Sequence, residues 1–236
     1  CSSDLTKTQY NVTTERTLEA AKRLSEKYSG KRIAVLNFAS ATNPGGGVAR
    51  GSSAQEESLC RCSTLYPCLK TDKLYGQFYA MHKNQHDTLY TDACIYTPDI
   101  VVIKSDALFP QAVPKSERFK VDVVTCAAPN LRKKPYNAMN PGQGVPTKLT
   151  PTELFDIHVK RGKHILDVAA SNGADVVVLG AFGCGAFRND PNIVANAYGH
   201  VLCNYKSIFD EVVFAIYCSS DDTENYDRFK EVIGRV

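Results

Sequence analysis

The sequence of 236 residues has none of the features that mark several specialised classes of protein. No stretch approaches the roughly 18 consecutive apolar residues of a membrane span, and residues 1–10 lack the apolar core of a signal peptide. No internal repeat or low-complexity segment is present. The net charge of +3 is too small to indicate a nucleic-acid partner by itself, although a local positive field would suit an anionic ligand. We therefore expect a soluble protein with no membrane partner.

The cysteines and histidines lack the spacing of a disulfide framework or of a metal site. The nine cysteines are odd in number and scattered through the chain, so we expect reduced thiols and a cytoplasmic location. Cys60, Cys62 and Cys68 lack the Cys-x-x-Cys spacing of zinc sites. His82 and His86 are four residues apart and would share one face of a helix, but no third ligand stands near them. We expect solvated histidines, and neither a metal nor another cofactor.

Five short apolar runs, rich in Val and Ile, are predicted to be strands buried on both faces, because most of them lack polar alternation. These runs are Ile33–Ala39, Ile100–Ile103, Val121–Ala127, Val176–Ala181 and Val212–Tyr217. Apolar residues at helical spacing, prolines at first helical positions and a capping box at Thr150–Glu153 predict helices. The predicted helices are Thr14–Lys27, Thr150–Asn172, Asn189–Tyr205 and Asp222–Ile233. The alternation of strand and helix favours an α/β protein, a three-layer α/β/α sandwich around a mixed, largely parallel central sheet.

The length of the chain suits one domain. The segment Leu131–Val145 contains prolines, glycines and lysines and is predicted to be a long loop rather than a domain boundary. Its basic run Arg132-Lys133-Lys134 would be solvated, or would steer a polyanion toward a cleft. We expect residues 1–236 to form a single domain and the protein to be a monomer.

Two glycine-rich segments follow predicted strands, at the level where ligands bind in open α/β sheets. The first contains Gly45–Gly47, whose backbone can approach a ligand and present N–H groups to an anion. Gln55-Glu56-Glu57 follows at the expected start of a helix, where the helix dipole favours a carboxylate. The second segment, Gly183–Phe187, leads into a helix that begins at Asn189-Asp190-Pro191, an arrangement typical of diphosphate sites. Together the two segments predict a site for a dinucleotide-like ligand.

Each segment alone also has a simpler interpretation. Three glycines are more often a flexible surface loop, and an acidic pair on a helix is usually solvated. The spacing differs from the Rossmann fingerprint and no Walker lysine follows either loop, so neither a hydride-transfer enzyme nor a P-loop NTPase is supported. Cys184 is a weak candidate for a nucleophile, because cysteines in glycine turns usually serve the geometry of the turn.

These motifs and their order resemble the microbial-type poly(ADP-ribose) glycohydrolase family, which has the macrodomain fold. The signature of that family is a triple glycine, a short spacer and Gln-Glu-Glu, and it stands here as Gly45–Gly47, seven residues and Gln55–Glu57. The segments "TLEAAKRL", "SAQEESLCRCSTLY", "VDVVTCAAPN" and "LGAFGCGAFRNDP" also resemble the family. The resemblance covers most of the chain and implies a glycosidase-type hydrolase that acts on ADP-ribose polymers.

The resemblance further implies that Glu57 is the catalytic acid and that Glu56 positions the ribose next to the scissile bond. The first glycine loop would approach this ribose and the diphosphate, the second would wrap the diphosphate, and Phe187 would pack against the terminal ribose. The implied ligand-binding residues are Asn43, Gly45, Gly46, Gly47, Val48, Gln55, Gly183, Cys184, Gly185, Ala186 and Phe187. Adenine would bind near the N-terminal segment and the end of the last strand, around Ser219.

A ribose–ribose bond breaks through an oxocarbenium-like transition state, for which most glycosidases place two carboxyl groups on opposite sides of the sugar. Neighbouring helical residues point about 100° apart, so Glu56 and Glu57 cannot flank a sugar in that way. We expect Glu57 to protonate the leaving oxygen and then to activate water, helped by a pKa raised by burial and by the neighbouring carboxylate. Two alternatives stay open: a hydrolase that removes mono-ADP-ribose from protein or nucleic acid, and a non-catalytic ADP-ribose-binding module.

Overall fold

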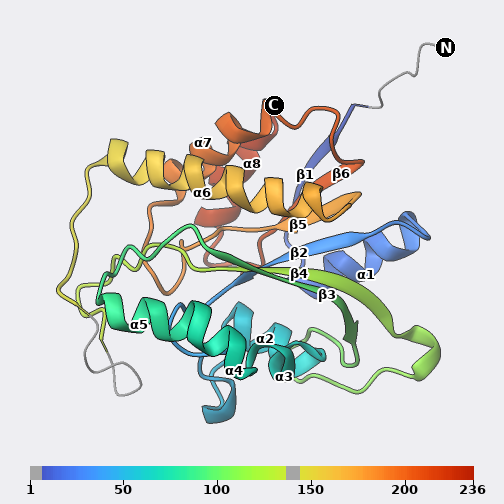
Figure 1. Cartoon of the computed structure of the whole chain (residues 1–236). Helices are drawn as coiled ribbons and strands as arrows, with labels where there is room; N and C mark the ends of the chain where they lie inside the picture. The colour runs from blue at the N-terminus through green and yellow to red at the C-terminus, as the bar shows by residue number, and fades with distance from the viewer. Residues whose placement is uncertain (1–6, 137–143) are drawn as a thin grey trace.

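The computed structural model describes residues 7–136 and 144–236, which form a six-stranded sheet between two layers of helices (Figure 1). The strands are β1 (Gln9–Thr13), β2 (Ile33–Phe38), β3 (Cys94–Val102), β4 (Phe119–Cys126), β5 (Val176–Leu179) and β6 (Glu211–Ala215). Their order across the sheet is β1-β6-β5-β2-β4-β3, and every neighbouring pair is parallel except β3 and β4. The predicted three-layer α/β/α arrangement with a mixed, largely parallel sheet is confirmed.

The helices divide between the two faces of the sheet, as Figure 1 shows. One face is covered by α6 (Pro151–Ser171), α7 (Pro191–Leu202) and α8 (Glu224–Ile233). The other face is covered by α1 (Thr17–Lys27) and by a series of short helices. These are α2 (Gln55–Cys62), α3 (Leu65–Leu69), α4 (Asp72–Leu74), a π-helical segment (Tyr75–Ala80) and α5 (Met81–Gln85). Each layer of helices therefore covers its own apolar core.

The strands divide their side chains between these two cores because successive residues of a strand point to opposite faces. In β2, Ala34 and Leu36 pack in the core under α6 and α7, whereas Ile33 and Val35 pack under α1. The Val-rich strand β5 is buried at every position. This burial on both faces explains why the central strands have no polar alternation in the sequence.

Local sequence signals set the starts of two helices. Thr150 caps α6 through a capping box, in which the Glu153 N–H donates to Thr150 Oγ1 and the Thr150 N–H donates to the Glu153 carboxylate. Asp190 caps α7 by accepting from the N–H groups of Asn192 and Ile193, and Pro191 occupies the first turn. Both starts were predicted from the sequence and are confirmed.

The sequence-based prediction was incomplete at the edges of the sheet. It missed β1, a half-exposed edge strand without the apolar run of a buried one. It placed the strand before β4 at Ile100, whereas β3 begins at Cys94 and carries an irregularity between Thr97 and Ile100. It also predicted no helices between residues 63 and 85. The predicted loop Leu131–Val145 has no helix or strand where it is described, and residues 137–143 lie outside the described part of the chain.

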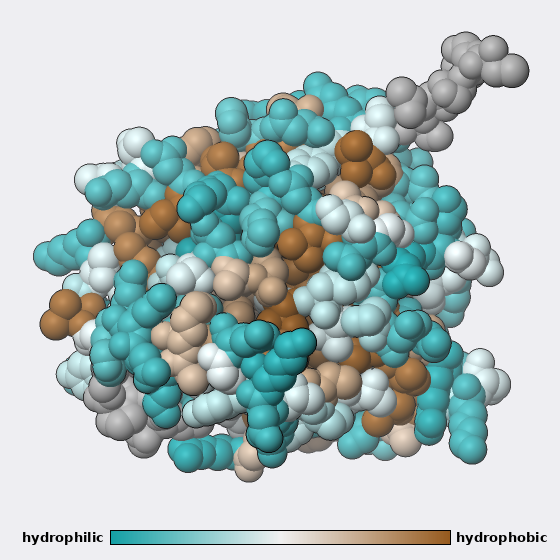
Figure 2. Space-filling model, viewed as in Figure 1, coloured by the Kyte–Doolittle hydropathy of each residue, from teal (hydrophilic) through white to brown (hydrophobic). Residues whose placement is uncertain are grey.

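The surface has the composition expected around such cores. The face in Figure 2 is mostly hydrophilic, with small hydrophobic patches between polar side chains. Within residues 7–136 and 144–236, no helix combines the length and the apolar character that crossing a membrane requires. Because β2, β4, β5 and β6 are parallel, their carboxyl ends meet at one edge of the sheet, where ligands bind in folds of this class.

Candidate active site

A cavity of about 430 Å³ lies at this edge of the sheet. It is bordered by the loops that follow β2, β4 and β5, by the start of α2 and by the end of β6. A cavity of this volume lies within the usual range for small-ligand sites. Its lining includes Arg16, Phe38, Ser40, Gly46, Gly47, Gln55, Glu56, Glu57, Tyr90, Asn130, Arg132, Phe182, Gly183, Gly185, Ala186, Phe187, Tyr217 and Asn225. The two predicted glycine loops and the acidic pair therefore meet in one cavity.

The first glycine loop is shaped by two glycines in the left-handed region. Gly45 has φ 68° and Gly46 has φ 57°, backbone conformations that other residues rarely adopt. A Cβ atom on Gly46 would collide with the carboxylate of Glu57 and would lie 3.0 Å from Glu56 Oε2. A Cβ atom on Gly45 would lie 2.6 Å from the ring of Tyr66. Glycine is thus needed both for the turn and for the close approach of the acidic pair.

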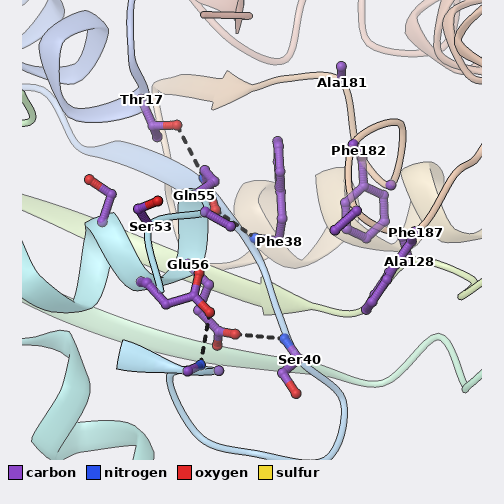
Figure 3. A pocket seen from close by; sticks show the side chains of 18 of the residues that line it. Thr17, Phe38, Ser40, Ser53, Gln55, Glu56, Ala128, Ala181, Phe182 and Phe187 are labelled. Carbon is purple, nitrogen blue, oxygen red and sulfur yellow. Dashed lines mark hydrogen bonds between the residues drawn. The ribbon is translucent and has the colours of Figure 1, made fainter. Parts of the chain in front are cut away.

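Glu56 is buried at the first turn of α2 and is held by the loop after β2. Its Oε2 accepts from the Ser40 N–H at 2.7 Å (Figure 3), and its Oε1 accepts from Asn37 Nδ2 at 3.3 Å. Burial raises the pKa of Glu56 to about 8, the backbone N–H of Ser40 opposes this shift, and the neighbouring Glu57 adds to it. Glu56 is consequently protonated in most molecules near pH 7. The carboxyl group of the pair with a clearly raised pKa is that of Glu56.

Glu57 also lines the cavity, with 8% of its surface exposed. Its Oε1 accepts from the Gly47 N–H at 2.8 Å. Both carboxylates approach the same point beside the Cα atom of Gly46, so they lie on one side of the cavity rather than facing each other across it. This geometry confirms that the two acids cannot flank a sugar as a glycosidase pair does.

Asn37, in β2, supports the acidic pair from below. It is fully buried, and its Nδ2 donates to Glu56 and to Thr125 Oγ1 at 3.2 Å. Its Oδ1 has no hydrogen-bond partner among the atoms that the structure describes, although such groups in a protein interior are nearly always paired. The unpaired acceptor therefore lies next to the one carboxyl group in this cavity with a strongly raised pKa.

Gln55 borders the cavity, but its side chain is bound to the protein. Its Nε2 donates to Leu36 O at 2.7 Å and to Thr17 Oγ1 at 3.1 Å, and its Oε1 accepts from the Phe38 N–H at 2.9 Å (Figure 3). These bonds pair the amide with one edge of the β2 backbone, at Leu36 and Phe38, and with the start of α1. We interpret Gln55 as the residue that fixes α2 to the sheet, so that the two acids after it have a defined position.

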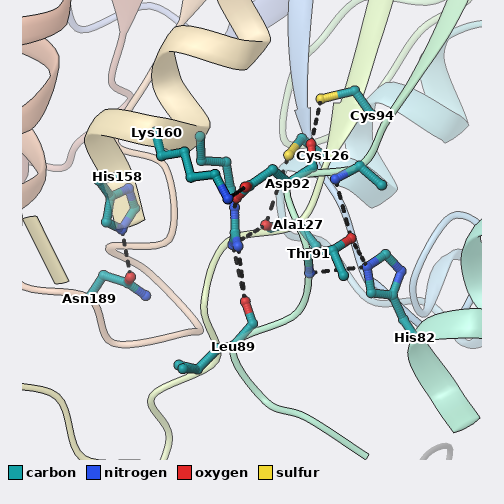
Figure 4. Close-up of polar contacts among 12 residues, drawn as sticks. His82, Leu89, Thr91, Asp92, Cys94, Cys126, Ala127, His158, Lys160 and Asn189 are labelled. Atoms are coloured by element: carbon teal, nitrogen blue, oxygen red, sulfur yellow. Dashed lines mark hydrogen bonds and ion pairs between the residues drawn. The ribbon is translucent and has the colours of Figure 1, made fainter. Parts of the chain in front are cut away.

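The second glycine loop, residues 183–187, is held from below by Asn189. Gly183 has φ 82°, and the Asn189 Nδ2 donates to Pro129 O at 2.8 Å and to Gly183 O at 3.1 Å. The Asn189 Oδ1 accepts from His158 Nε2 at 2.8 Å (Figure 4). Because burial lowers the pKa of His158 to about 4, this imidazole is neutral and carries its proton on Nε2. A rigid, uncharged network therefore supports the loop.

A second buried network supports the loop after β4. The Arg161 guanidinium donates to Ala127 O at 2.8 Å and pairs with Asp92 at 3.1 Å. Ala127 directly precedes Ala128, which lines the cavity. Arg161 is almost fully buried, and its charge is balanced within the network, so it acts as a structural residue beneath the site.

Aromatic residues form the apolar part of the cavity. Phe38 and Phe182 pack with ring centroids 5.6 Å apart, and Figure 3 shows both rings with Phe187 on the same side of the cavity. Tyr90 packs against Phe187 at 6.2 Å. Phe187 therefore lines the cavity beside an aromatic partner that was not predicted.

Four predicted ligand-binding residues do not line this cavity. Asn43 borders a separate small hollow, and Gly45 packs against Tyr66. Val48 begins a short 3-10 turn and packs against the core under α1. Cys184 packs against the opposite core, and burial raises the pKa of its thiol, which argues against a nucleophile. The geometry gives these four residues a role in the shape of the loops.

The cavity extends to the end of β6, where adenine was expected. The guanidinium of Arg16 lies 3.9 Å from the ring centroid of Tyr217, and Asn225 lies beside them in the lining. Ser219 does not line the cavity, whereas Tyr217, two residues before it, does. A planar base would find a stacking surface here.

Sequence reasoning missed the cavity residues that come from distant segments. Phe38 is the last residue of β2 and carried no distinct signal within that apolar run. Tyr90 lies in a loop without a recognisable motif, and Asn130 ends a segment that resembles the family but was not predicted to line the site. Arg132 was noted only as part of a basic run. These residues are brought to the cavity by the order of the strands, which the sequence alone does not reveal.

The predicted histidine pair does not form a metal site. His82 is buried, and its ring nitrogens contact Phe78 O and Thr91 Oγ1. His86 follows the end of α5 with φ 52°, so it does not share a helical face with His82. Among the residues that the structure describes, no group of three His, Cys, Asp or Glu side chains is arranged to hold a metal ion. The expectation of a solvated His82 was wrong, because it is buried.

Comparisons with known proteins agree with this geometry. The family described as microbial-type PARG, catalytic domain, matches residues 1–105. No curated protein matches the chain. Poly(ADP-ribose) glycohydrolase from Thermomonospora curvata, bound to the inhibitor ADP-HPD, is similar with a TM-score of 0.82 and 35% identity, over 95% of this chain and 78% of that one. The enzyme from Deinococcus radiodurans in complex with ADP-ribose has a TM-score of 0.81 and 35% identity, over 98% of this chain and 85% of that one.

These two matches are each 35% identical to the chain over 95% and 98% of its length. The matched residues 1–105 include the first glycine loop and the acidic pair. The chain belongs to the microbial-type poly(ADP-ribose) glycohydrolase family, a family of glycosidase-type hydrolases.

Proposed function

We propose that the protein hydrolyses the ribose–ribose O-glycosidic bond of poly(ADP-ribose) and releases ADP-ribose, with Glu57 as the general acid and base. The observation that carries this proposal is the buried acidic pair at Gly46, which lies in the same cavity as the second glycine loop. A module that only binds ADP-ribose would have no need for two buried carboxyl groups, whose burial is costly.

The cavity suggests how the terminal ADP-ribose unit would lie. Adenine would stack at Tyr217, at the end of β6, and the diphosphate would lie between the two glycine loops, where backbone N–H groups suit an anion. The distal ribose would then reach Phe187 and the acidic pair. The solved structure from Deinococcus radiodurans contains ADP-ribose, which supports this class of ligand for the present chain.

Glu57 would carry the proton through both halves of the reaction. In the first half its carboxyl group protonates the oxygen that leaves the distal ribose, and the C–O bond breaks to give an oxocarbenium-like ribose. In the second half the Glu57 carboxylate takes a proton from water as the water oxygen attacks the anomeric carbon. The ligand diphosphate would stabilise the positive charge in between. Glu56, protonated near neutral pH, would donate a hydrogen bond to the ribose and orient it.

The Glu57→Gln variant tests this assignment. We expect it to release no ADP-ribose from poly(ADP-ribose) in a chromatographic assay, because the amide cannot transfer the proton. Calorimetric binding of free ADP-ribose should stay within a few-fold of wild type, since the amide keeps the shape of the side chain. Glu26→Gln, at an exposed position of α1 without a hydrogen bond or ion pair to a described side chain, is the matched control and should keep full activity. A Glu57→Gln enzyme with wild-type turnover would refute the role of Glu57.

The same assay separates the remaining functions. Release of ADP-ribose only from mono-ADP-ribosylated protein or nucleic acid, and not from polymer, would identify a mono-ADP-ribosyl hydrolase. Binding of ADP-ribose without release from any of these substrates would identify a binding module. Either result would show that the polymer is not the substrate, while the proposed position of ADP-ribose in the cavity would stay the same.

The setting of the enzyme is also part of the proposal. We place it in the cytoplasm, as one macrodomain-like domain that acts as a monomer. The cysteines within the described part of the chain are all free, which supports a reducing environment. Light scattering of the purified protein would test the monomer, and a dimer at micromolar concentration would contradict it.

A further inference from the structure

The order of the strands gives the bound ligand a direction. Tyr217 follows β6, Gly183 follows β5, the acidic pair follows β2, and Arg132 lies in the loop after β4. Because the sheet order is β6-β5-β2-β4, these groups line the cavity in that sequence. A ligand with its adenine at Tyr217 and its distal ribose at Glu57 therefore points toward Arg132.

In a polymer, the chain does not end at the distal ribose. The oxygen that leaves this ribose belongs to the adenosine ribose of the next ADP-ribose unit, which has a diphosphate of its own. The β6 side of the cavity is already taken by the terminal adenine, so the next unit must lie on the β4 side of Glu57. A substrate with a small neutral leaving group would have no second diphosphate there.

Arg132 is built into this side of the cavity rather than free in solvent. Its Nε donates to Asn130 Oδ1 at 3.3 Å, and its Nη2 donates to Pro135 O at 3.1 Å. Asn130 itself is buried, and the Leu131 N–H donates to Phe187 O at 2.9 Å, which ties the loop to the second glycine loop. The guanidinium of Arg132 is therefore held at a defined place next to the residues that contact the distal ribose.

The charge of Arg132 is not balanced by the protein. Its hydrogen-bond partners are neutral oxygens, and no carboxylate of residues 7–136 or 144–236 forms an ion pair with it. Arg161, in the network beneath, is instead paired with Asp92. Lys133 and Lys134 follow on the exposed side and likewise have no ion pair within the described residues. Three consecutive cationic side chains thus follow one another from the cavity to the exposed surface, and none of them forms an ion pair within the described residues.

We propose that Arg132, Lys133 and Lys134 form a subsite for the diphosphate of the leaving ADP-ribose unit. A guanidinium binds phosphate oxygens through directed hydrogen bonds, and the two ammonium groups add charge along the chain. The subsite would make the enzyme prefer a polymer over a single ADP-ribose with a neutral attachment. This inference rests on the proposed function, because it identifies which part of the polymer the same site recognises.

The test compares two variants on two substrates. The variants are Arg132→Gln and the double variant Lys133→Gln/Lys134→Gln. The substrates are poly(ADP-ribose) and an ADP-ribose with a neutral nitrophenyl leaving group. For Arg132→Gln we expect KM for the polymer to rise roughly tenfold or more, the usual effect of losing a charged hydrogen bond. For the double variant, the slope of log KM for the polymer against log salt should fall by about 1.4 units, about 0.7 for each lysine.

The controls isolate the leaving unit. KM for the nitrophenyl substrate and the Kd of free ADP-ribose should stay within twofold of wild type, because neither ligand contains a second diphosphate. The matched charge control is Lys7→Gln/Lys206→Gln, at the amino ends of β1 and β6 and far from the cavity, and it should leave the polymer KM unchanged. Circular dichroism melting of each variant checks that the fold is kept.

Two results would overturn the inference. An unchanged polymer KM in both variants would show that the cations do not contact the leaving unit. An equal loss of affinity for free ADP-ribose would show that Arg132 binds the diphosphate of the terminal unit instead. The proposed function fails in a different way, since the wild-type enzyme would then release no ADP-ribose from polymer.

Discussion

Replacing Glu56 by glutamine is expected to remove a pH dependence of ADP-ribose binding that the wild-type enzyme shows between pH 7 and pH 9. Burial raises the pKa of Glu56 to about 8. With that value, about ten in eleven molecules hold the proton at pH 7 and about one in eleven holds it at pH 9. The mean charge of Glu56 therefore changes by about 0.8 unit within this pH range.

The size of the expected change in ADP-ribose affinity depends on which protonation form of Glu56 can bind the ligand. ADP-ribose brings a negatively charged diphosphate into the cavity and covers Glu56, so an ionised Glu56 carboxylate would lie buried near another anion. If only the protonated form of Glu56 binds, the affinity falls about tenfold from pH 7 to pH 9, a loss of about 1.4 kcal/mol. Glutamine at position 56 donates its amide hydrogen at every pH, and the affinity of the variant should stay constant.

The buried side-chain amide of Asn37 can accept a hydrogen bond from protonated Glu56 when no ligand is bound. As it stands, Asn37 Nδ2 faces Glu56, and Asn37 Oδ1 has no partner among the described atoms. A half-turn of the amide exchanges these two atoms and turns an acceptor toward a protonated Glu56. The amide can therefore pair with Glu56 in either protonation state, donating to the carboxylate and accepting from the acid.

Titration calorimetry at pH 7, 8 and 9, at one ionic strength, measures this effect directly. The diphosphate of ADP-ribose keeps its charge over this range, so a change in affinity reports on the protein. Glu26→Gln should follow the wild type and so controls for a general effect of removing a carboxylate. A wild-type affinity that does not change with pH, or an equal decline in the Glu56→Gln variant, would refute the reasoning.

Two further predictions concern the loops that shape the cavity. Gly46→Ala should keep the fold, at a cost of about 1–2 kcal/mol for the left-handed backbone. It should nevertheless reduce ADP-ribose release in the polymer assay at least a hundredfold, because the new Cβ displaces the carboxylate of Glu57. Asn189→Ala removes three donated hydrogen bonds beneath the second glycine loop, and it should lower the free energy of unfolding in urea by about 3 kcal/mol and weaken ADP-ribose binding. Asn192→Ala, an exposed neighbour, controls for the helix start, and equal stability of the two Asn variants would contradict the second prediction.

The sequence was sufficient to predict the centre of the site because that part depends on local signals. Buried strands are recognisable by their unbroken apolar runs, and the carboxyl ends of parallel strands lie at one edge. Any two glycine loops that follow such strands must therefore lie near each other. The loops at Gly46 and Gly183 meet in the cavity for this reason, and Glu56 and Glu57 come with the first of them.

The rest of the site could not be predicted because it depends on strand order. Arg16 and Tyr217 are two hundred residues apart, yet their side chains stack because β1 and β6 pair at the edge of the sheet. β1 has no buried apolar run, so neither the strand nor this contact left a signal in the sequence. The role of Gln55 could not be predicted for a different reason. It belongs to the recognisable motif, but only the structure reveals that its amide binds the backbone of β2.

The position of Gln55 also explains how a single strand, β2, can position the acidic pair. Through its amide, the first turn of α2 is fixed to the backbone of β2 at Leu36 and Phe38. The side chain of Asn37, between these two residues, contacts Glu56. Three consecutive residues of one central strand thus hold the helix and one of its two acids, and this strand is paired on both sides, with β4 and β5. Because such a strand cannot shift without breaking both ladders, Glu57 is held in place against the glycine loop before any substrate binds, as electrostatic catalysis requires.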